Sequence, residues 1–339
     1  MLPRSRRRGV ALPVILSVLL WACAAPGGSP SAAPATMAPS STSSAVTPAA
    51  SPSQAVRFPV TITDDEGTSV ELASEPQVIV SLTPATTEIL FELGVGDRVV
   101  ATDDSSDYPE AAVDLPDVAS FSSVDVEQVV SLEPDLVVAG GLGFTPADAI
   151  TRLRSLDIPV LVVYAPSVEG VYDDIELLGM ATGTSHAAGE LTAAMAVEID
   201  AISDAVGSGD RPRVFYEIGY DATTGAIYAP AKDSFVAEMV TVGGGDTITT
   251  ADPNTYEIPL EELIERDPEV IVLGVNPFYQ PTPEAVAARP GWNAMTAVAN
   301  GDIRTVRDIE ITRPGPRLPV GIRNLAAAIR PDVALPTTP

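Results

Sequence analysis

The feature that most constrains the fold is a long helical pattern in the middle of the chain. Between residues 186 and 206, apolar side chains recur three or four positions apart, as at Leu191, Met195 and Ile199. This spacing places them on one face of a helix. The pattern ends at the glycine-containing stretch 207–209, where a helix is expected to stop. No other helical pattern in the sequence is as long.

The sequence on both sides of this helix alternates between short apolar runs and helical patterns. The runs are continuous, as in Leu136-Val137-Val138-Ala139, which is typical of strands in parallel sheets that are covered on both faces. The sequence therefore predicts an α/β fold with two Rossmann-like lobes joined by a single long helix. The predicted strands are 78–82, 99–101, 136–139 and 160–163 before the helix, and 214–218, 270–273 and 303–306 after it.

Composition shifts along the chain suggest how it is divided. Residues 24–55 are almost entirely Ala, Pro, Ser, Thr and Gly, and such a segment buries too little apolar surface to fold. The expected division is a signal peptide (1–22), a disordered tether (23–55), an N-terminal lobe (56–180), a linking helix (181–209), a C-terminal lobe (210–330) and a tail (331–339).

The N-terminus resembles a bacterial lipoprotein signal peptide. Four arginines within residues 4–8 precede an apolar stretch, 10–20, that is too short to span a membrane comfortably. The only cysteine of the chain, Cys23, follows after Trp21 and Ala22. We expect Cys23 to be lipidated and to anchor the protein at the outer face of the cytoplasmic membrane. The alternative is an ordinary secretory signal, because Trp21 departs from the lipoprotein pattern.

Charge and histidine content exclude several functions. The chain carries a formal charge of −27, and removal of residues 1–22 with their four arginines lowers it to −31. Such a chain does not bind nucleic acid by charge. His186 is the only histidine, so a histidine metal cluster and an HExxH motif are excluded. We therefore expect no enzymatic activity, no metal site and no cofactor.

A short motif early in the N-terminal lobe predicts a capped helix. In the run 81–94, Thr83 is the expected cap, Pro84 occupies the first helical position and Gly94 follows the end. Ile89, Leu90 and Leu93 form the expected buried stripe. Glu88 lies outside this stripe near the N-terminal end, where the helix dipole stabilises a carboxylate. Glu88 is therefore expected to face solvent.

Several ordered motifs together resemble the solute-binding proteins of ABC importers for vitamin B12 and ferric siderophores. They are 81–94, 96–100, 107–109, 115–121, 132–137, 289–292 and 313–317, and the resemblance covers roughly residues 57–330. It implies the class III periplasmic-binding-protein fold, with a shallow cleft between the lobes. It also implies an ABC permease and its ATPase as partners, and a corrinoid or a ferric chelate as ligand.

The resemblance also implies roles for individual residues. Glu88 would dock onto the permease, and Glu238 is the candidate for the matching carboxylate on the second lobe. Candidate ligand-binding residues are the aromatic side chains of Tyr108 and Phe121 and the polar side chains of Asp308 and Arg313. Where B12-binding relatives carry further tryptophans, this chain has Gly140 and a stretch around Tyr256.

The sequence leaves the ligand and the physiological role open. A ferric siderophore or haem is the alternative to cobalamin. A surface lipoprotein that senses its ligand without transporting it is the alternative role. An enzyme built on the same scaffold is disfavoured, because the chain has no second histidine and no GxSxG motif.

Overall fold

The computed structural model describes residues 57–337, and these fall within one compact unit. The N-terminal lobe is built on a six-stranded sheet in the order β6-β5-β4-β3-β7-β8. All neighbouring pairs are parallel except β5 with β6. The strands are β3 (Ile79–Ser81), β4 (Val99–Asp103), β5 (Asp117–Ser120), β6 (Ser123–Val124), β7 (Leu136–Gly140) and β8 (Val160–Val163). A separate antiparallel hairpin, β1 (Val60–Thr63) with β2 (Ser69–Leu72), precedes them.

Helices connect the strands of this lobe. They are α1 (Pro84–Glu92), the 3-10 turn η1 (Gly96–Arg98), α2 (Glu110–Val113), α3 (Val126–Ser131) and α4 (Ala147–Ser155). Every residue of β7 and β8 is buried, as expected for strands covered on both faces. The predicted parallel sheet is thereby confirmed.

The C-terminal lobe repeats the same architecture with a four-stranded parallel sheet in the order β12-β9-β13-β14. Its strands are β9 (Arg213–Glu217), β12 (Asp246–Thr247), β13 (Val270–Val275) and β14 (Ile303–Arg307), with a small hairpin of β10 (Gly219–Tyr220) and β11 (Ile227–Tyr228). Its helices are α7 (Phe235–Val242), α8 (Leu260–Arg266), α9 (Pro283–Ala287), η2 (Trp292–Ala294), α10 (Thr296–Asn300), α11 (Ile309–Thr312) and α12 (Leu318–Ile329).

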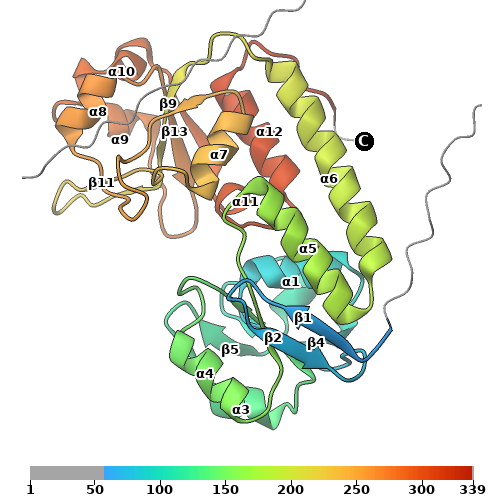
Figure 1. The fold of residues 1–339 in the computed structure, drawn as a ribbon. Helices are drawn as coiled ribbons and strands as arrows, with labels where there is room; N and C mark the ends of the chain where they lie inside the picture. Colours follow the sequence, from blue (N-terminus) through green and yellow to red (C-terminus); the bar gives the residue numbers. More distant parts are fainter. Residues whose placement is uncertain (1–56, 338–339) are drawn as a thin grey trace, which may run out of the picture. The chain divides into compact units, whose positions relative to one another are not determined.

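A helical hairpin connects the two lobes (Figure 1). The 15-residue α5 (Val168–Thr182) is followed closely by the 22-residue α6 (Ser185–Val206), which carries the chain to the C-terminal lobe. The predicted long linking helix is confirmed, and α5 packs along it. The two helices approach closely at Gly179, where a Cβ atom would lie 2.5 Å from the Cβ of Ala188.

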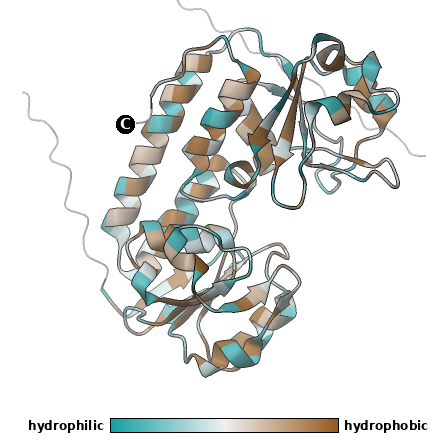
Figure 2. Ribbon diagram, turned by 180° about the vertical axis from the view of Figure 1, so that it is seen from behind, coloured by the Kyte–Doolittle hydropathy of each residue, from teal (hydrophilic) through white to brown (hydrophobic). Residues whose placement is uncertain are grey.

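The hydrophobic core runs from one lobe to the other through this hairpin. One cluster of buried side chains includes Ile79 in β3, Leu178 in α5, Ile199 in α6, Val214 in β9 and Ile322 in α12. Figure 2 shows helices whose colour alternates between hydrophobic and hydrophilic along their length, which is the pattern of helices with one buried face. The lobes are therefore held by shared packing as well as by the chain.

Several expectations fall outside the described residues. The signal peptide, the lipidated Cys23 and the tether up to residue 55 belong to this group. Within residues 57–337, no helix is both long enough and apolar enough to cross a bilayer. The lobe boundaries expected at residues 180 and 209 stay predictions.

Candidate functional site

A cavity of about 440 Å³ lies between the lobes. Its lining comes from α1 and from the segments that follow β3, β4, β5, β7 and β8 in one lobe, and from segments near β9, α7 and α11 in the other. Carboxyl ends of parallel strands are the usual place for a ligand in α/β sheets. The side chains that line it are Leu82, Thr83, Pro84, Ala85, Thr86, Ile89, Asp103, Ser105, Phe121, Gly140, Phe144, Val163, Tyr164, Ala165, Asp174, Ile218, Val236, Tyr256, Thr312, Arg313 and Pro314.

Three aromatic rings form one wall of the cavity. Phe144 and Tyr164 are nearly parallel, with an interplanar angle of 27° and centroids 6.2 Å apart. Phe121 meets Phe144 edge-on at 6.4 Å and 85°. Tyr256 lines the cavity from the C-terminal lobe. Burial, together with the neighbouring Tyr256, raises the pKa of Tyr164 above its ordinary value, so the Tyr164 phenol stays neutral at physiological pH.

A network of buried hydroxyl groups lies beneath the cavity at the start of α1. Thr83 caps this helix by accepting from the backbone N–H of Thr86. The Ser81 hydroxyl bonds to the hydroxyls of both Thr86 and Thr87, and the Ser106 hydroxyl joins Thr87 to Asp103. Burial raises the pKa of Asp103, although the hydrogen bond from Ser106 partly opposes this shift. The network fixes α1 and the loop after β4 against each other.

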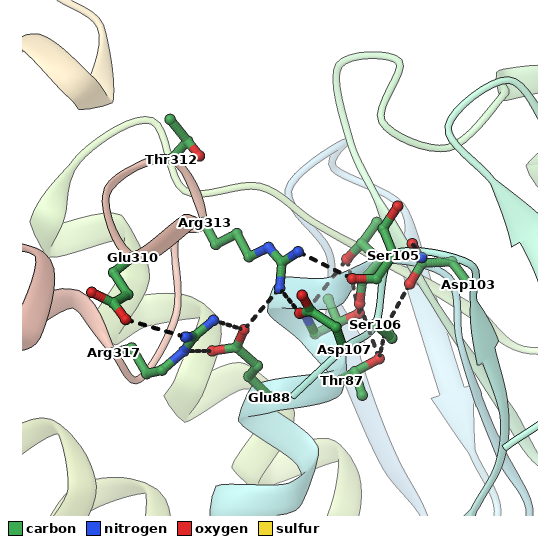
Figure 3. Close-up of polar contacts among 12 residues, drawn as sticks. Thr87, Glu88, Asp103, Ser105, Ser106, Asp107, Glu310, Thr312, Arg313 and Arg317 are labelled. Atoms are coloured by element: carbon green, nitrogen blue, oxygen red, sulfur yellow. Dashed lines mark hydrogen bonds and ion pairs between the residues drawn. The ribbon is translucent and has the colours of Figure 1, made fainter. Parts of the chain in front are cut away.

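A cluster of ion pairs bridges the two lobes next to the cavity (Figure 3). Glu88 belongs to α1, whereas Arg317 directly precedes α12. Arg317 Nε donates to Glu88 Oε2 at 2.8 Å, and Arg317 Nη2 donates to Glu88 Oε1 at 2.6 Å. Arg313 Nη1 donates to Glu88 Oε1 at 3.5 Å. Burial is the largest single influence on the pKa of Arg317 and would lower it, but the hydrogen bonds to Glu88 and the negative charges of Glu88, Glu310 and Asp107 together raise it.

Arg313 connects this ion-pair cluster to the cavity. It lines the cavity while its Nη1 donates to Asp107 Oδ1 at 2.5 Å and its Nη2 donates to the carbonyl oxygen of Ser105 at 3.1 Å. The guanidinium of Arg317 in turn lies 4.5 Å from the centroid of the Tyr108 ring, a cation–π arrangement. Arg313 and Arg317, which belong to the C-terminal lobe, thus contact the N-terminal lobe directly.

The expectation that Glu88 faces solvent is wrong. Its side chain is only 1% exposed. The helical pattern identified the residues that face the core of the N-terminal lobe, but the arginines that cover Glu88 lie more than two hundred positions away in sequence. Docking of Glu88 onto a permease stays a prediction, and it now requires the bonds to Arg317 to open.

Glu238 is half-buried and already bonded. Its Oε2 accepts from the backbone N–H of Val168 at 2.9 Å, at the first residue of α5. A carboxylate at this position stabilises a helix N-terminus. Its contact therefore ties α7 of the C-terminal lobe to the start of the helical hairpin. The predicted docking role of Glu238 is untested.

The structure brings two of the four expected ligand-binding residues together. Phe121 and Arg313 both line the cavity. Tyr108 lies under Arg317 instead. Asp308 is buried in the C-terminal lobe, where it accepts from the hydroxyl of Tyr216 at 2.6 Å. Asp308 therefore bonds the buried hydroxyl of Tyr216 and is not among the residues that line the cavity.

Sequence reasoning missed most of the residues that line the cavity, among them Phe144, Tyr164 and Asp174. Phe144 and Tyr164 follow the ends of β7 and β8, and the pair Gly140-Gly141 at a strand end was the available signal. Asp174 of α5 is 4% exposed. Burial, reinforced by the nearby Asp65, raises its pKa from 3.8 to about 9. Asp174 is therefore protonated at neutral pH and adds no charge to the cavity.

Comparisons with known proteins agree in family and fold. A sequence model of the family described as periplasmic binding protein matches residues 79–309. An uncharacterized ABC transporter substrate-binding lipoprotein of Bacillus subtilis is 34% identical over 282 residues, which cover 81% of this chain and 87% of that protein. A cobalamin-binding protein of Halobacterium salinarum is 33% identical over 286 residues, which cover 81% of this chain and 75% of that protein.

Solved structures of similar proteins show the same architecture. A possible iron-binding periplasmic solute-binding protein from Staphylococcus epidermidis superposes with a TM-score of 0.66 at 25% identity, covering 76% of this chain and 100% of its own. The periplasmic vitamin B12 binding protein of Vibrio cholerae superposes with a TM-score of 0.65 at 23% identity, covering 75% of this chain and 97% of its own. At that identity the second likeness shows the fold alone.

Proposed function

Because the chain belongs to the periplasmic binding protein family, we propose that its cleft captures a corrinoid of the vitamin B12 type for an ABC importer. The observation that carries the ligand assignment is the lining of the cavity, which is mainly apolar and aromatic. Large flat ligands suit aromatic walls, which bury wide apolar areas at little cost in side-chain entropy. The Halobacterium relative, named a cobalamin-binding protein, supports the same ligand.

Charge in the cavity disfavours an anionic ferric chelate. Arg313 is the only basic side chain among the described residues that line it, and its guanidinium is already bonded to Asp107 and Glu88. A tricatecholate complex of ferric iron carries several negative charges, which would meet one cation whose charge is already compensated. A ligand whose periphery is largely neutral amides avoids this cost.

Haem is the second candidate, and one observation favours it. Tyr164 and Tyr256 line the cavity from opposite lobes, and a tyrosine oxygen is a known ligand of ferric haem. The raised pKa of Tyr164 weighs against it, because coordination requires loss of the phenol proton. Corrinoid binding needs no such ionisation.

A comparative titration tests the ligand assignment. The purified protein is titrated with cyanocobalamin, haemin and a ferric tricatecholate, and bound ligand is measured by equilibrium dialysis. We expect cyanocobalamin to bind with a Kd of roughly 1 μM or tighter, and the tricatecholate to bind far more weakly. Tighter binding of haemin or of the tricatecholate, or no measurable binding of cyanocobalamin, would contradict the proposal.

We also propose that the mature protein is anchored through a lipid on Cys23 at the outer face of the cytoplasmic membrane. The sequence 4–23 supports this, and the Bacillus subtilis relative is named a lipoprotein. A single lipid anchor places the body within reach of a permease in the same membrane. The mature wild-type protein should incorporate a radioactively labelled fatty acid, and Cys23→Ala should not. Absence of label from the wild-type protein would contradict the anchor.

A further inference from the structure

We propose that Phe144 and Tyr164 form the face on which a flat ring of the ligand stacks, and that Gly140 and Gly141 make this face possible. The proposal rests on the proposed function, because it assigns a position to the ring system of a corrinoid. It makes Phe144 a specificity-determining residue and Gly140 a positioning residue. Four observations carry it.

The first observation is the space above the two glycines. A Cβ atom at Gly140 would lie 2.7 Å from Thr83 Cγ2 and 2.9 Å from the Cβ of Phe144. A Cβ atom at Gly141 would lie 3.1 Å from the Cβ of Tyr164. Contacts below 3.0 Å force neighbouring atoms to shift. Any side chain at residue 140 would therefore displace Phe144 from the end of β7.

The second observation is that the loop carrying Phe144 is held in place before any ligand arrives. The backbone N–H of Gly140 donates to the hydroxyl of Thr145 at 3.0 Å, and the N–H of Thr145 donates back to the Gly140 carbonyl at 3.1 Å. The N–H of Phe144 donates to the Gly141 carbonyl at 3.1 Å. Gly143 has a φ of +89°, which glycine adopts without strain. A preformed loop does not pay an ordering cost on binding.

The third observation is the orientation of the rings. Phe144 and Tyr164 are stacked and lie within 27° of parallel, so each ring holds the orientation of the other. Phe121 meets Phe144 edge-on and adds a second contact to the Phe144 ring. An aromatic ring held in this way suits a flat ring system that stacks on it.

The fourth observation is exposure. Phe144 is 49% exposed although its loop is rigidly bonded. The backbone of Tyr164 is also fixed, because its N–H donates to Asp65 Oδ2 at 2.5 Å. Fixed aromatic surface that is left half uncovered inside a cavity lowers the free energy when a ligand covers it. Arg313 and the ion-pair cluster approach the cavity from the other lobe and leave this face free.

Substitution at residue 144 tests the proposal in the full-length protein. Phe144→Ala should weaken cyanocobalamin binding by about tenfold or more, the loss expected for one stacked ring. Phe144→Trp should restore binding to within about threefold of wild type. Phe278→Ala is the matched control, because Phe278 is 97% exposed and is not among the residues that line the cavity. It should change affinity by less than about twofold.

A fluorescence measurement separates contact with the ligand from a structural effect. The tryptophan introduced by Phe144→Trp should be quenched on saturation with cyanocobalamin, beyond any change in the wild-type signal. Gly140→Ala should weaken binding as Phe144→Ala does, and it should also lower the thermal unfolding midpoint, because the added methyl meets Thr83 Cγ2 at 2.7 Å. Phe144→Ala should leave the midpoint close to that of wild type, because Phe144 is half exposed. These variants leave the opposite lobe unchanged.

Each outcome has a defined meaning. If wild type binds cyanocobalamin and Phe144→Ala binds it within twofold, the stacking face is refuted and the proposed function stands. If quenching is absent while wild type and Phe144→Trp bind equally, the stacking face is also refuted. If wild type binds none of the corrinoids tested, the proposed function fails, and the stacking face for a corrinoid fails with it.

Discussion

Replacement of Glu88 with glutamine should destabilise the protein far more than replacement of any exposed acid. Glu88 is 1% exposed and accepts two hydrogen bonds from Arg317 and one from Arg313. Glutamine keeps the size of the side chain and removes the charge. It leaves two arginines, both mostly buried, facing a neutral group.

The structure sets the size of this effect. Removal of one partner from a buried ion pair costs about 3–5 kcal/mol, and two charges 4 Å apart interact by about 4 kcal/mol at an effective dielectric constant near 20. Part of this loss is offset, because Arg317 keeps Glu310 at 3.7 Å and Arg313 keeps Asp107 at 2.5 Å. We therefore expect Glu88→Gln to lower the free energy of unfolding by about 2–4 kcal/mol.

Urea denaturation followed by far-UV circular dichroism measures this change. Asp107→Asn is the control, because Asp107 bonds the same Arg313 but its side chain is 51% exposed. It should cost no more than about 1 kcal/mol. A double-mutant cycle of Glu88→Gln with Arg317→Met should give a coupling of about 1–3 kcal/mol. A loss below about 0.5 kcal/mol for Glu88→Gln would refute the reasoning that the lobes are joined electrostatically here.

Three further predictions concern the helical hairpin. The raised pKa of Asp174, about 9, means that the folded state holds a proton that the unfolded state releases near pH 4, so stability falls as pH rises from about 4 to 9. Asp174→Asn should flatten this decline and raise the free energy of unfolding at pH 7 by on the order of a few kcal/mol. Urea unfolding at pH 5, 7 and 9 measures both effects, and an unchanged dependence of stability on pH would contradict the reasoning. Glu238→Ala removes the acceptor for the N–H of Val168 and should cost about 1 kcal/mol of unfolding free energy; no loss would mean that the contact is dispensable. Gly179→Ala should cost about 1–3 kcal/mol because the added methyl meets α6 at 2.5 Å. Gly189→Ala, with nothing within 4 Å of the added atom, should stabilise the protein by up to about 1 kcal/mol, and equal effects at the two glycines would exclude the packing explanation.

The main elements of the fold could be predicted from the sequence because their signals are local. Continuous apolar runs identified β7 and β8, and spacing of three or four identified α6. Capping and glycine signals gave the limits of α1, in agreement with its bounds of Pro84–Glu92. The strands β5 and β6 and the hairpin β10–β11 were missed. These strands are two to four residues long, too short for a period to be detected.

The site was only partly predictable, because its residues come from distant parts of the chain. Phe121 and Arg313 were selected by resemblance and do line the cavity. Glu88 was placed in solvent because its covering residues lie in the other lobe. Asp308 is a polar residue at a strand end, yet it accepts a hydrogen bond from the hydroxyl of Tyr216, which lies in β9 of the same sheet. Such pairings depend on tertiary contacts that a pattern within one segment does not contain.

The bridge made by Arg313 has a consequence for how cargo leaves the protein. One side chain lines the cavity and bonds the opposite lobe through Asp107 and the Ser105 carbonyl. Coupling between two sites is reciprocal. If bound ligand stabilises this bridge by a certain free energy, then breaking the bridge lowers the binding free energy of the ligand by the same amount. When cargo strengthens the bridge, a permease that draws the lobes apart weakens cargo binding by the same factor. Unloading then needs no contact between the permease and the cargo itself.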